Sequence, residues 1–403
     1  MIKNIFLSLL FIVSSLLGFA QNDPIDAQAE AAIREGRFSV LTCSPGPNLY
    51  SVFGHTAIRV EMVANGKIVD WVYNYGTFEF TEDFYVKFAK GQLDYRLSKA
   101  DFGFFQQEYI LTGRGIVEQE LELDGNEKVK LFELLEKNYE PENRYYRYDF
   151  FYDNCATRVR DIINQSLNNE VQFSYVYPRQ FTFRQSIQNY LDYMPWSDFG
   201  IDLALGMPCD RIVEKGQMMF LPDSLENDFS MAYVHDKPLT KRAVEILPKD
   251  FELNRVGWIT PINVFGLFMI IQLMIGIWWG KISFVDRILL FTTGFIGLVV
   301  FLLWFFTDHG GTKWNLNILW ANPINLYFAF SSFKKTWILK FFKVYGLIQA
   351  MIIIGWFFLP QRFHLATLPM IIGLLYISIR LVRPSFLPNR NENATKRKNT
   401  ATA

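Results

Sequence analysis

The stretch DNCATRVRDII, residues 153–163, places a thiol at the predicted start of a helix. Asp153 and Asn154 are preferred N-cap residues, so the pattern predicts a helix that begins at Cys155. The apolar residues that share a helical face with this cysteine are Val159, Ile162 and Ile163. The positive end of the helix dipole and the unpaired N–H groups of the first turn favour a thiolate. These N–H groups, that of Cys155 included, can also hold an oxyanion when the thiolate attacks a carbonyl.

A base for this thiol is expected at His55. The residues HTAIRVEM, numbered 55–62, alternate as in a β-strand, Asn65-Gly66 supplies a hairpin turn, and residues 68–75 form the partner strand. A cysteine at a helix start that faces a histidine on a strand is the papain-type arrangement. By spacing alone, the pair also fits a buried structural thiol and a polar-core histidine. Asp70 and Asn74 share one strand face, and we prefer Asn74 as the residue that orients the histidine.

Composition indicates a chain of two unlike parts. Its 403 residues carry 40 basic and 40 acidic side chains, and this balance excludes a protein that binds nucleic acid non-specifically through an excess of positive charge. Half the residues are hydrophobic although 20% are charged, a mixture that suits a globular domain joined to a membrane bundle. The other two cysteines, Cys43 and Cys209, fit either a disulfide or two buried thiols.

Residues 1–20 are predicted to be a secretory signal peptide, with an uncleaved anchor as the alternative. One lysine precedes the charge-free run of residues 5–19, and Gly18 and Ala20 are small, as a signal peptidase requires. Residues 21–250 are then extracytoplasmic and long enough for one α+β domain. In this domain, residues 144–152 are predicted to form an aromatic strand that leads to Cys155.

Residues 251–384 are predicted to form a bundle of five transmembrane helices. The charge-free runs are residues 259–280, 288–306, 314–333, 344–361 and 363–379. Four asparagines and Pro323 interrupt the third run, which is a span or a re-entrant segment. Basic residues crowd the odd connections and the tail, residues 385–403, which places these in the cytoplasm.

Several motifs resemble one family. They are Pro45-Gly46, YSVFGHTAIR at 50–59, NYGTF at 74–78, DNCATR at 153–158, LGMP at 205–208, MFLP at 219–222 and the stretch 308–323. Their order resembles the Lnb-type apolipoprotein N-acyltransferase family, whose periplasmic domain has a permuted papain-like fold of the NlpC kind. The resemblance implies an inner-membrane enzyme with Cys155 as nucleophile and His55 as base. It implies acyl transfer from a phospholipid to the N-terminal amine of a diacylglyceryl lipoprotein, with no cofactor and no metal.

Asp308, His309 and Trp314 follow the second span on its outer side and are candidate substrate contacts. An ordinary interfacial loop with an aromatic anchor is the alternative. Three other functions stay open at this point. They are a cell-wall peptidase with the same thiol–histidine pair, a catalytically silent membrane scaffold, and a phospholipase or thioesterase in which water replaces the amine.

Overall fold

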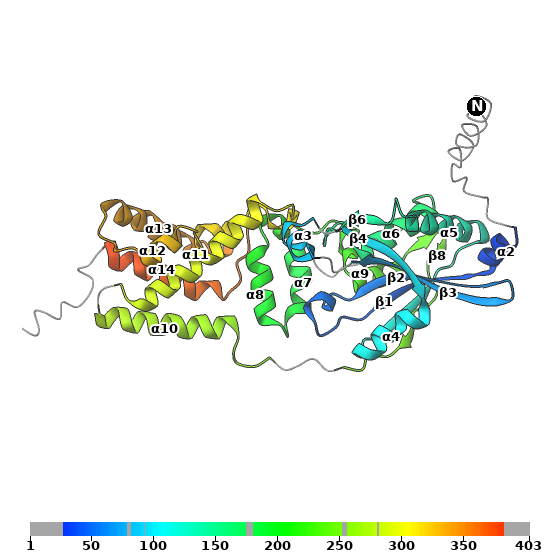
Figure 1. The fold of residues 1–403 in the computed structure, drawn as a ribbon, viewed down its shortest axis with the longest axis horizontal. Coiled ribbons are helices and arrows are strands. Elements are labelled where there is room, and N and C mark those ends of the chain that lie inside the picture. Colours follow the sequence, from blue (N-terminus) through cyan, green and yellow to red (C-terminus); the bar gives the residue numbers. More distant parts are fainter. Residues whose placement is uncertain are drawn as a thin grey trace, which may run out of the picture.

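The computed structural model describes residues 27–78, 82–92, 94–174, 180–251, 256–279 and 282–382. A domain built on an antiparallel sheet is followed by a bundle of helices, which confirms the expected fold class. Figure 1 shows the sheet domain at one end of an elongated molecule and the bundle at the other. The expected signal peptide, residues 1–20, and the basic tail, residues 385–403, lie outside the described residues.

The described sheet has seven strands in the order β6-β4-β3-β2-β1-β5-β9, and every neighbouring pair is antiparallel. The strands are β1 (Arg37–Cys43), β2 (His55–Ala64), β3 (Lys67–Thr77), β4 (Asp94–Asp101), β5 (Ile116–Glu120), β6 (Tyr145–Arg147) and β9 (Val244–Leu247). A separate short ladder joins β7 (Tyr233–Val234) to β8 (Lys237–Pro238). The predicted hairpin turn connects β2 to β3, and both Asn65 and Gly66 have the positive φ that such a turn needs.

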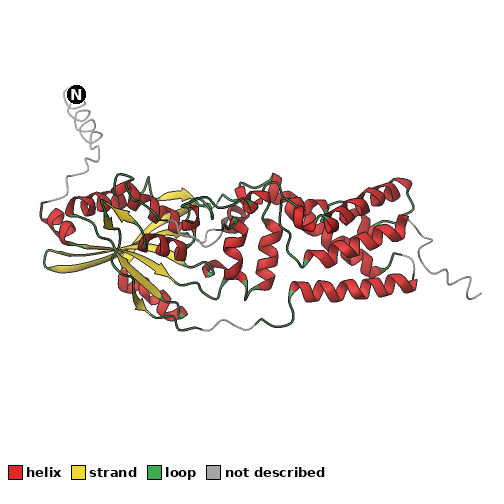
Figure 2. Cartoon of the chain, turned by 180° about the vertical axis from the view of Figure 1, so that it is seen from behind, coloured by secondary structure: helices red, strands yellow, loops and turns green. Residues whose placement is uncertain are grey.

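Helices cover both faces of the sheet because its strands alternate apolar side chains between the two faces. One face packs against α2 (Ala27–Glu35), α5 (Gly125–Tyr139), α6 (Cys155–Ser166) and α9 (Pro222–Ser230). The other face packs against α4 (Phe102–Thr112) through Phe105 and Tyr109. A further short helix, α3 (Phe84–Lys90), precedes β4. Figure 2 shows the sheet between these helices.

The aromatic strand predicted at residues 144–152 is shorter in the structure. Only Tyr145–Arg147 is strand, and the chain then turns back on itself through a bridge between Asp149 and Asp153. The carboxylate of Asp149 accepts hydrogen bonds from the backbone N–H groups of Phe151 and Tyr152. Local hydrogen bonding by an aspartate therefore competes with the strand here and ends it.

Two helices, α7 (Phe183–Leu191) and α8 (Pro195–Ala204), lie between the sheet domain and the bundle. They run across the long axis of the molecule, whereas α10 runs along it (Figure 1). Arg184 holds them together from a fully buried position, through Asp202 of α8 and Asp210 of the following 3-10 turn. Each carboxylate is thus paired with the guanidinium of Arg184. Such pairing is needed because an unpaired buried charge is strongly destabilising.

The bundle contains α10 (Pro261–Trp279), α11 (Phe284–Phe305), α12 (Asn325–Phe330), α13 (Thr336–Ile354) and α14 (Thr367–Val382). Among the described residues, α10, α11 and α13 are long and apolar enough to cross a membrane, and α14 is a shorter apolar helix of 16 residues. The helix α13 begins before its charge-free run, residues 344–361, because its first turns include charged residues such as Lys340. The helix α14 begins after the start of its run, residues 363–379, and continues past the end of that run through Arg380.

The third predicted span is not a continuous helix. Residues 314–333 contain a 3-10 turn, Leu316–Leu319, and the six-residue helix α12. Lys313 Nζ donates to Trp304 O near the outer end of α11, whereas Arg287 Nη1 at its inner end donates to Ala329 O. The segment therefore runs the length of α11 as broken backbone. Such backbone is tolerated at membrane depth because protein covers it.

The three cysteines are free and buried, so Cys43 and Cys209 do not form a disulfide. Cys43 lies under α4, and Cys209 lies near the bundle, where its thiol donates to Gly311 O at 3.3 Å. They belong to separate apolar clusters of the protein.

Candidate active site

Cys155 is the first residue of α6, as the cap pattern predicted. The side-chain oxygen of Asn154 accepts from the N–H groups of Ala156 and Thr157, each at 2.9 Å. Its amide nitrogen donates to Phe150 O and Phe220 O, which fixes the cap against two other segments. Asp153 does not cap the helix but forms an ion pair with Arg158 one turn along it. The thiol therefore sits on a rigid helix start.

His55 begins β2 and meets Asn74 of β3. The distance between His55 Nε2 and Asn74 Oδ1 is 2.6 Å, so the imidazole N–H donates to the amide oxygen. The other candidate, Asp70, instead accepts two hydrogen bonds from Arg59, at 2.8 and 2.7 Å. The structure thus places Asn74 against the histidine and Asp70 in an ion pair. Because Nε2 meets Asn74, Nδ1 is the nitrogen left for the thiol.

The charges of His55 and Cys155 stabilise each other. Burial by itself raises the pKa of Cys155, but the His55 cation, its hydrogen bond and the N–H groups of Thr56 and Ala156 outweigh it, so the pKa is lowered. Burial likewise lowers the pKa of His55, and the thiolate and Asn74 outweigh that effect and raise it. Both shifts favour a thiolate–imidazolium pair, which is the reactive form of a nucleophilic cysteine.

Gly76 lies directly beside this pair, at a bulge between β3 and β4. Its φ is +89°, and a Cβ on it would lie 3.7 Å from Cys155 Cβ and 3.8 Å from His55 Cε1. The same point is 3.9 Å from the hydroxyl oxygen of Tyr146. Because Gly76 has no side chain, a small space remains between Cys155, His55 and the hydroxyl of Tyr146.

Tyr146 and Arg158 are site residues that the sequence reasoning missed. The guanidinium of Arg158 lies 3.6 Å from the centre of the Tyr146 ring, and the tyrosine is 8% exposed. The available signal was the motif itself, because Arg158 stands three residues after Cys155 on a helix, which puts the two side chains on neighbouring faces. Tyr146 gave no such signal, since it lies in an aromatic-rich stretch where every second residue resembles it.

The outer connection after α11 touches the sheet domain close to β6. Asp308 accepts from Gln92 at 2.9 Å and pairs with Arg147 at 3.2 Å. The ring and backbone of His309 lie against Gly91, where a Cβ would come within 3.0–3.1 Å of them. These contacts join the loop to the turn before β4 and to the residue that follows Tyr146.

Trp314 lies apart from those contacts. Its side chain is 62% exposed, its ring centre is 5.6 Å from that of Trp304, and its φ is +51°. The two indoles lie at the outer end of α11, where aromatic side chains commonly sit at the headgroup level of a membrane.

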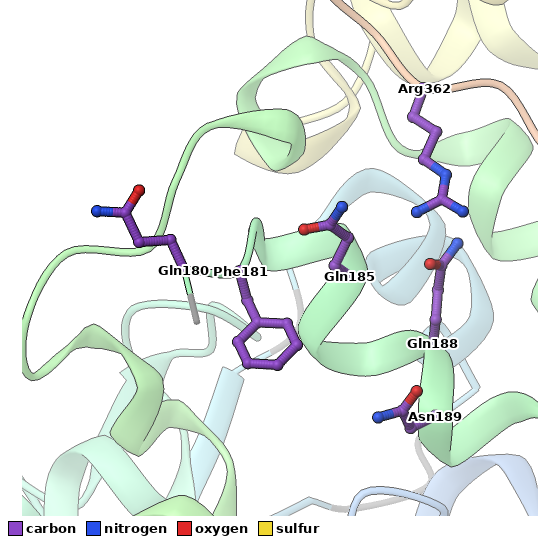
Figure 3. A pocket seen from close by; sticks show the side chains of 6 residues that line it. All are labelled: Gln180, Phe181, Gln185, Gln188, Asn189 and Arg362. Carbon is purple, nitrogen blue, oxygen red and sulfur yellow. The ribbon is translucent and has the colours of Figure 1, made fainter. Parts of the chain in front are cut away.

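A polar pocket of about 350 Å³ lies between α7 and the connection before α14. Its lining residues are Gln180, Phe181, Gln185, Gln188, Asn189 and Arg362. Figure 3 shows the guanidinium of Arg362 directed toward the amides of α7. Such a lining can hydrogen-bond a polar or anionic group, and the sequence reasoning named none of these residues as site residues.

Two family models match the chain. The model described as the Lnb N-terminal periplasmic domain matches residues 26–189, and the Lnb transmembrane domain matches residues 253–385. No curated protein and no solved structure gives a significant match. The first match includes strands β1 to β6, Cys155 and His55, and the second runs from the start of the bundle to its end. The chain therefore belongs to the Lnb family, as a membrane protein with an N-terminal periplasmic domain.

Proposed function

We propose that this protein is a lipoprotein N-acyltransferase of the inner membrane. It moves an acyl chain from a phospholipid, through an S-acyl-cysteine, to the α-amine of an N-terminal diacylglyceryl-cysteine. The observation that carries the proposal is the partly buried Cys155–His55–Asn74 arrangement, in a domain docked on a membrane bundle. A thiolate paired with an imidazolium suits attack on an ester and supplies an acid for the leaving group.

The first half of the reaction acylates the enzyme. The Cys155 thiolate attacks the ester carbonyl, a C–S bond forms, and the carbonyl π electrons move to oxygen. When the tetrahedral intermediate collapses, the C–O bond to glycerol breaks and the alkoxide takes the proton from His55. A lysophospholipid leaves, and His55 remains as the neutral imidazole, held in orientation by Asn74.

The second half transfers the chain to nitrogen. The neutral α-amine of the lipoprotein attacks the thioester, and His55 takes a proton from that amine as the C–N bond forms. Collapse of the intermediate expels the Cys155 thiolate, which regenerates the initial ion pair. The amide product is more stable than the thioester, so the transfer proceeds in this direction.

The membrane bundle gives this chemistry access to its substrates. Removing an acyl chain from the bilayer costs about 0.8 kcal/mol for each CH₂ group, so a soluble enzyme would face a large penalty for each substrate. A thiol held at the membrane surface avoids most of that penalty. We assign the docking of the two parts to Asp308 and His309, and contact with lipid or lipoprotein to Trp314, which is exposed.

The test is the mass of lipoprotein N-termini made in cells with and without this protein. We expect the added acyl chain with wild type and with Cys43→Ala, a control for a second buried thiol of the sheet domain. Cys155→Ala should give lipoproteins without that chain. Full N-acylation by Cys155→Ala would contradict the proposal. Release of free fatty acid with no N-acylation by wild type would instead establish a phospholipase.

A further inference from the structure

Tyr146 carries a buried hydroxyl close to Cys155 and His55. This oxygen is inaccessible to solvent and has no hydrogen-bond partner among the described residues. An unpaired buried hydroxyl destabilises the folded protein by about 1–3 kcal/mol. We therefore expect this hydroxyl to gain a hydrogen-bond partner when substrate binds. The small space at Gly76 lies between the Tyr146 hydroxyl, Cys155 and His55.

The surroundings of Tyr146 hold the phenol in a fixed position. Its ring lies under the guanidinium of Arg158, which Asp153 holds in turn with two hydrogen bonds of 2.6 and 2.8 Å. On another side, the ring meets Tyr75 edge to face at 6.3 Å between centres. Because Arg158 belongs to the helix that carries Cys155, the phenol and the thiol are positioned by the same element.

We propose that the Tyr146 hydroxyl donates a hydrogen bond to the oxyanion formed when Cys155 attacks the acyl carbonyl. This inference rests on the proposed acyl transfer and adds a catalytic residue to it. The phenol keeps its proton throughout: the π electrons of the carbonyl move to oxygen, the oxygen accepts the O–H hydrogen bond, and collapse returns the electrons. The same bond serves both tetrahedral intermediates, that of thioester formation and that of aminolysis.

The electrostatics agree with a donor role. Burial and the nearby thiolate both raise the pKa of Tyr146, so the hydroxyl stays protonated at any working pH. A buried donor that is already fixed in place needs no reorganisation when charge develops, which is why one such group has a large effect. Tyr148 is a second phenol whose pKa the Cys155 thiolate raises, after burial, and its ring stacks on Tyr95 at 4.2 Å.

The test measures S-acyl enzyme by intact mass after full-length protein is mixed with phospholipid vesicles in a single turnover. Tyr146→Phe should slow S-acylation by about 10²- to 10³-fold, the usual effect of losing one oxyanion donor. Its Cys155 should react with iodoacetamide at the wild-type rate, because alkylation forms no oxyanion. Tyr75→Phe is the matched control, since its hydroxyl is also buried but is bonded to Asn138. This control and Tyr148→Phe should acylate as wild type does.

A second variant separates hydrogen bonding from packing. Tyr146→Gln loses the ring but retains an N–H donor, so it should acylate faster than Tyr146→Phe. The inference is wrong if Tyr146→Phe acylates at the wild-type rate, or if the phenylalanine and glutamine variants are equally slow. It is also wrong if alkylation and acylation fall together in Tyr146→Phe. In each of these cases wild type still acylates, whereas a wild type that forms no S-acyl enzyme would overturn the proposed function itself.

Discussion

At the scale of single residues, the site depends on compensation between burial and charge. Burial opposes ionisation of both Cys155 and His55, and each group offsets that effect on the other. The remaining cysteines show the same burial without such a partner, and the pKa of each is raised to about 12. Position beside His55 therefore distinguishes Cys155, the proposed nucleophile, from the other two thiols.

This difference predicts the pH dependence of alkylation. Because the pKa of Cys155 is lowered, iodoacetamide should label it with a midpoint below pH ~8.5, the value of an unperturbed thiol. His55→Ala removes the opposing cation and leaves burial, so the midpoint should move above that of a free thiol. Labelling followed by peptide mass mapping measures both midpoints. A midpoint that His55→Ala leaves unchanged would contradict the ion pair.

Asn74 should affect the rate of S-acylation but not the presence of a thiolate at Cys155. Asn74→Ala removes the acceptor that orients the imidazole, and misplacement of a catalytic group costs up to about 10²-fold in rate. We expect slower S-acylation by this variant and a smaller loss than with His55→Ala. Asp70→Asn is the comparison on the same strand, because Asp70 is bonded to Arg59 and should affect stability rather than rate. Equal losses of rate in the two variants would argue against the orienting role.

At the scale of elements, the broken third span depends on two glycines of α11. A Cβ on Gly297 would lie 1.9 Å from Ala321 O, and one on Gly294 would lie 2.4 Å from Leu326 N. The irregular segment thus packs directly on the helix backbone at these positions. Buried amides support it from within, as where Asn325 donates to Thr293 and to Tyr345.

Gly297→Ala should therefore destabilise the bundle. The added methyl group overlaps a backbone carbonyl that cannot rotate away, and overpacking of this kind costs about 1–3 kcal/mol. Gly266→Ala, in α10, is the matched control because nothing lies within 4 Å of its added Cβ. Thermal unfolding in detergent should show a lower Tm for Gly297→Ala and little change for Gly266→Ala. Equal Tm values would mean that the segment does not pack on α11 as described.

At the scale of the whole molecule, the two parts are joined by buried polar contacts as well as by an exposed ion pair. Asn315 is fully buried, and its amide donates to Leu203 O and Ala204 O at the end of α8. Gln361 donates to Leu205 O and to the side chain of Asn315. The bundle thereby satisfies carbonyls at the end of a helix of the preceding domain, which would otherwise lack donors.

Asn315→Leu should weaken this joint. It removes the side-chain donor of Ala204 O, at about 1–3 kcal/mol for an unsatisfied group, and leaves Leu203 O with the amide of Asn317 as its donor. Hydrogen exchange of residues 195–213 should become faster, while the central strands of the sheet should exchange as in wild type. Asn263→Ala serves as the control, since Asn263 is exposed at the start of α10. Unchanged exchange in Asn315→Leu would show that these bonds do not hold the parts together.

The ion pair of Asp308 with Arg147 should contribute differently. Both side chains are more than half exposed, so the pair adds little to stability. We expect Asp308→Ala combined with His309→Ala to slow N-acylation of lipoproteins in membranes, because the loop no longer positions β6 and Tyr146. The Tm should stay close to that of wild type. A loss of Tm as large as that of Asn315→Leu would show that the loop is needed for folding.

The sequence by itself determined the features that rest on local chemistry. The start of α6 at Cys155 follows from Asn154, the hairpin from Asn65-Gly66, and the apolar helices from their composition. The partners of these elements were decided by tertiary structure. Asn74 and Asp70 share a strand face, and only the packing of β2 on β3 sets one against His55 and the other against Arg59.

Tertiary structure also decided where local signals competed. Asp149 ends the aromatic strand through a turn, and Asn315 and Asn325 find partners on α8, α11 and α13 that no sequence pattern specifies. Tyr146 belongs to the site because β6 pairs with β4 and Arg158 covers its ring. Caps, turns and apolar runs act over a few residues, so the sequence contains them directly. Contacts between residues far apart in the chain depend on how whole elements pack, and this is why they appear only in the folded molecule.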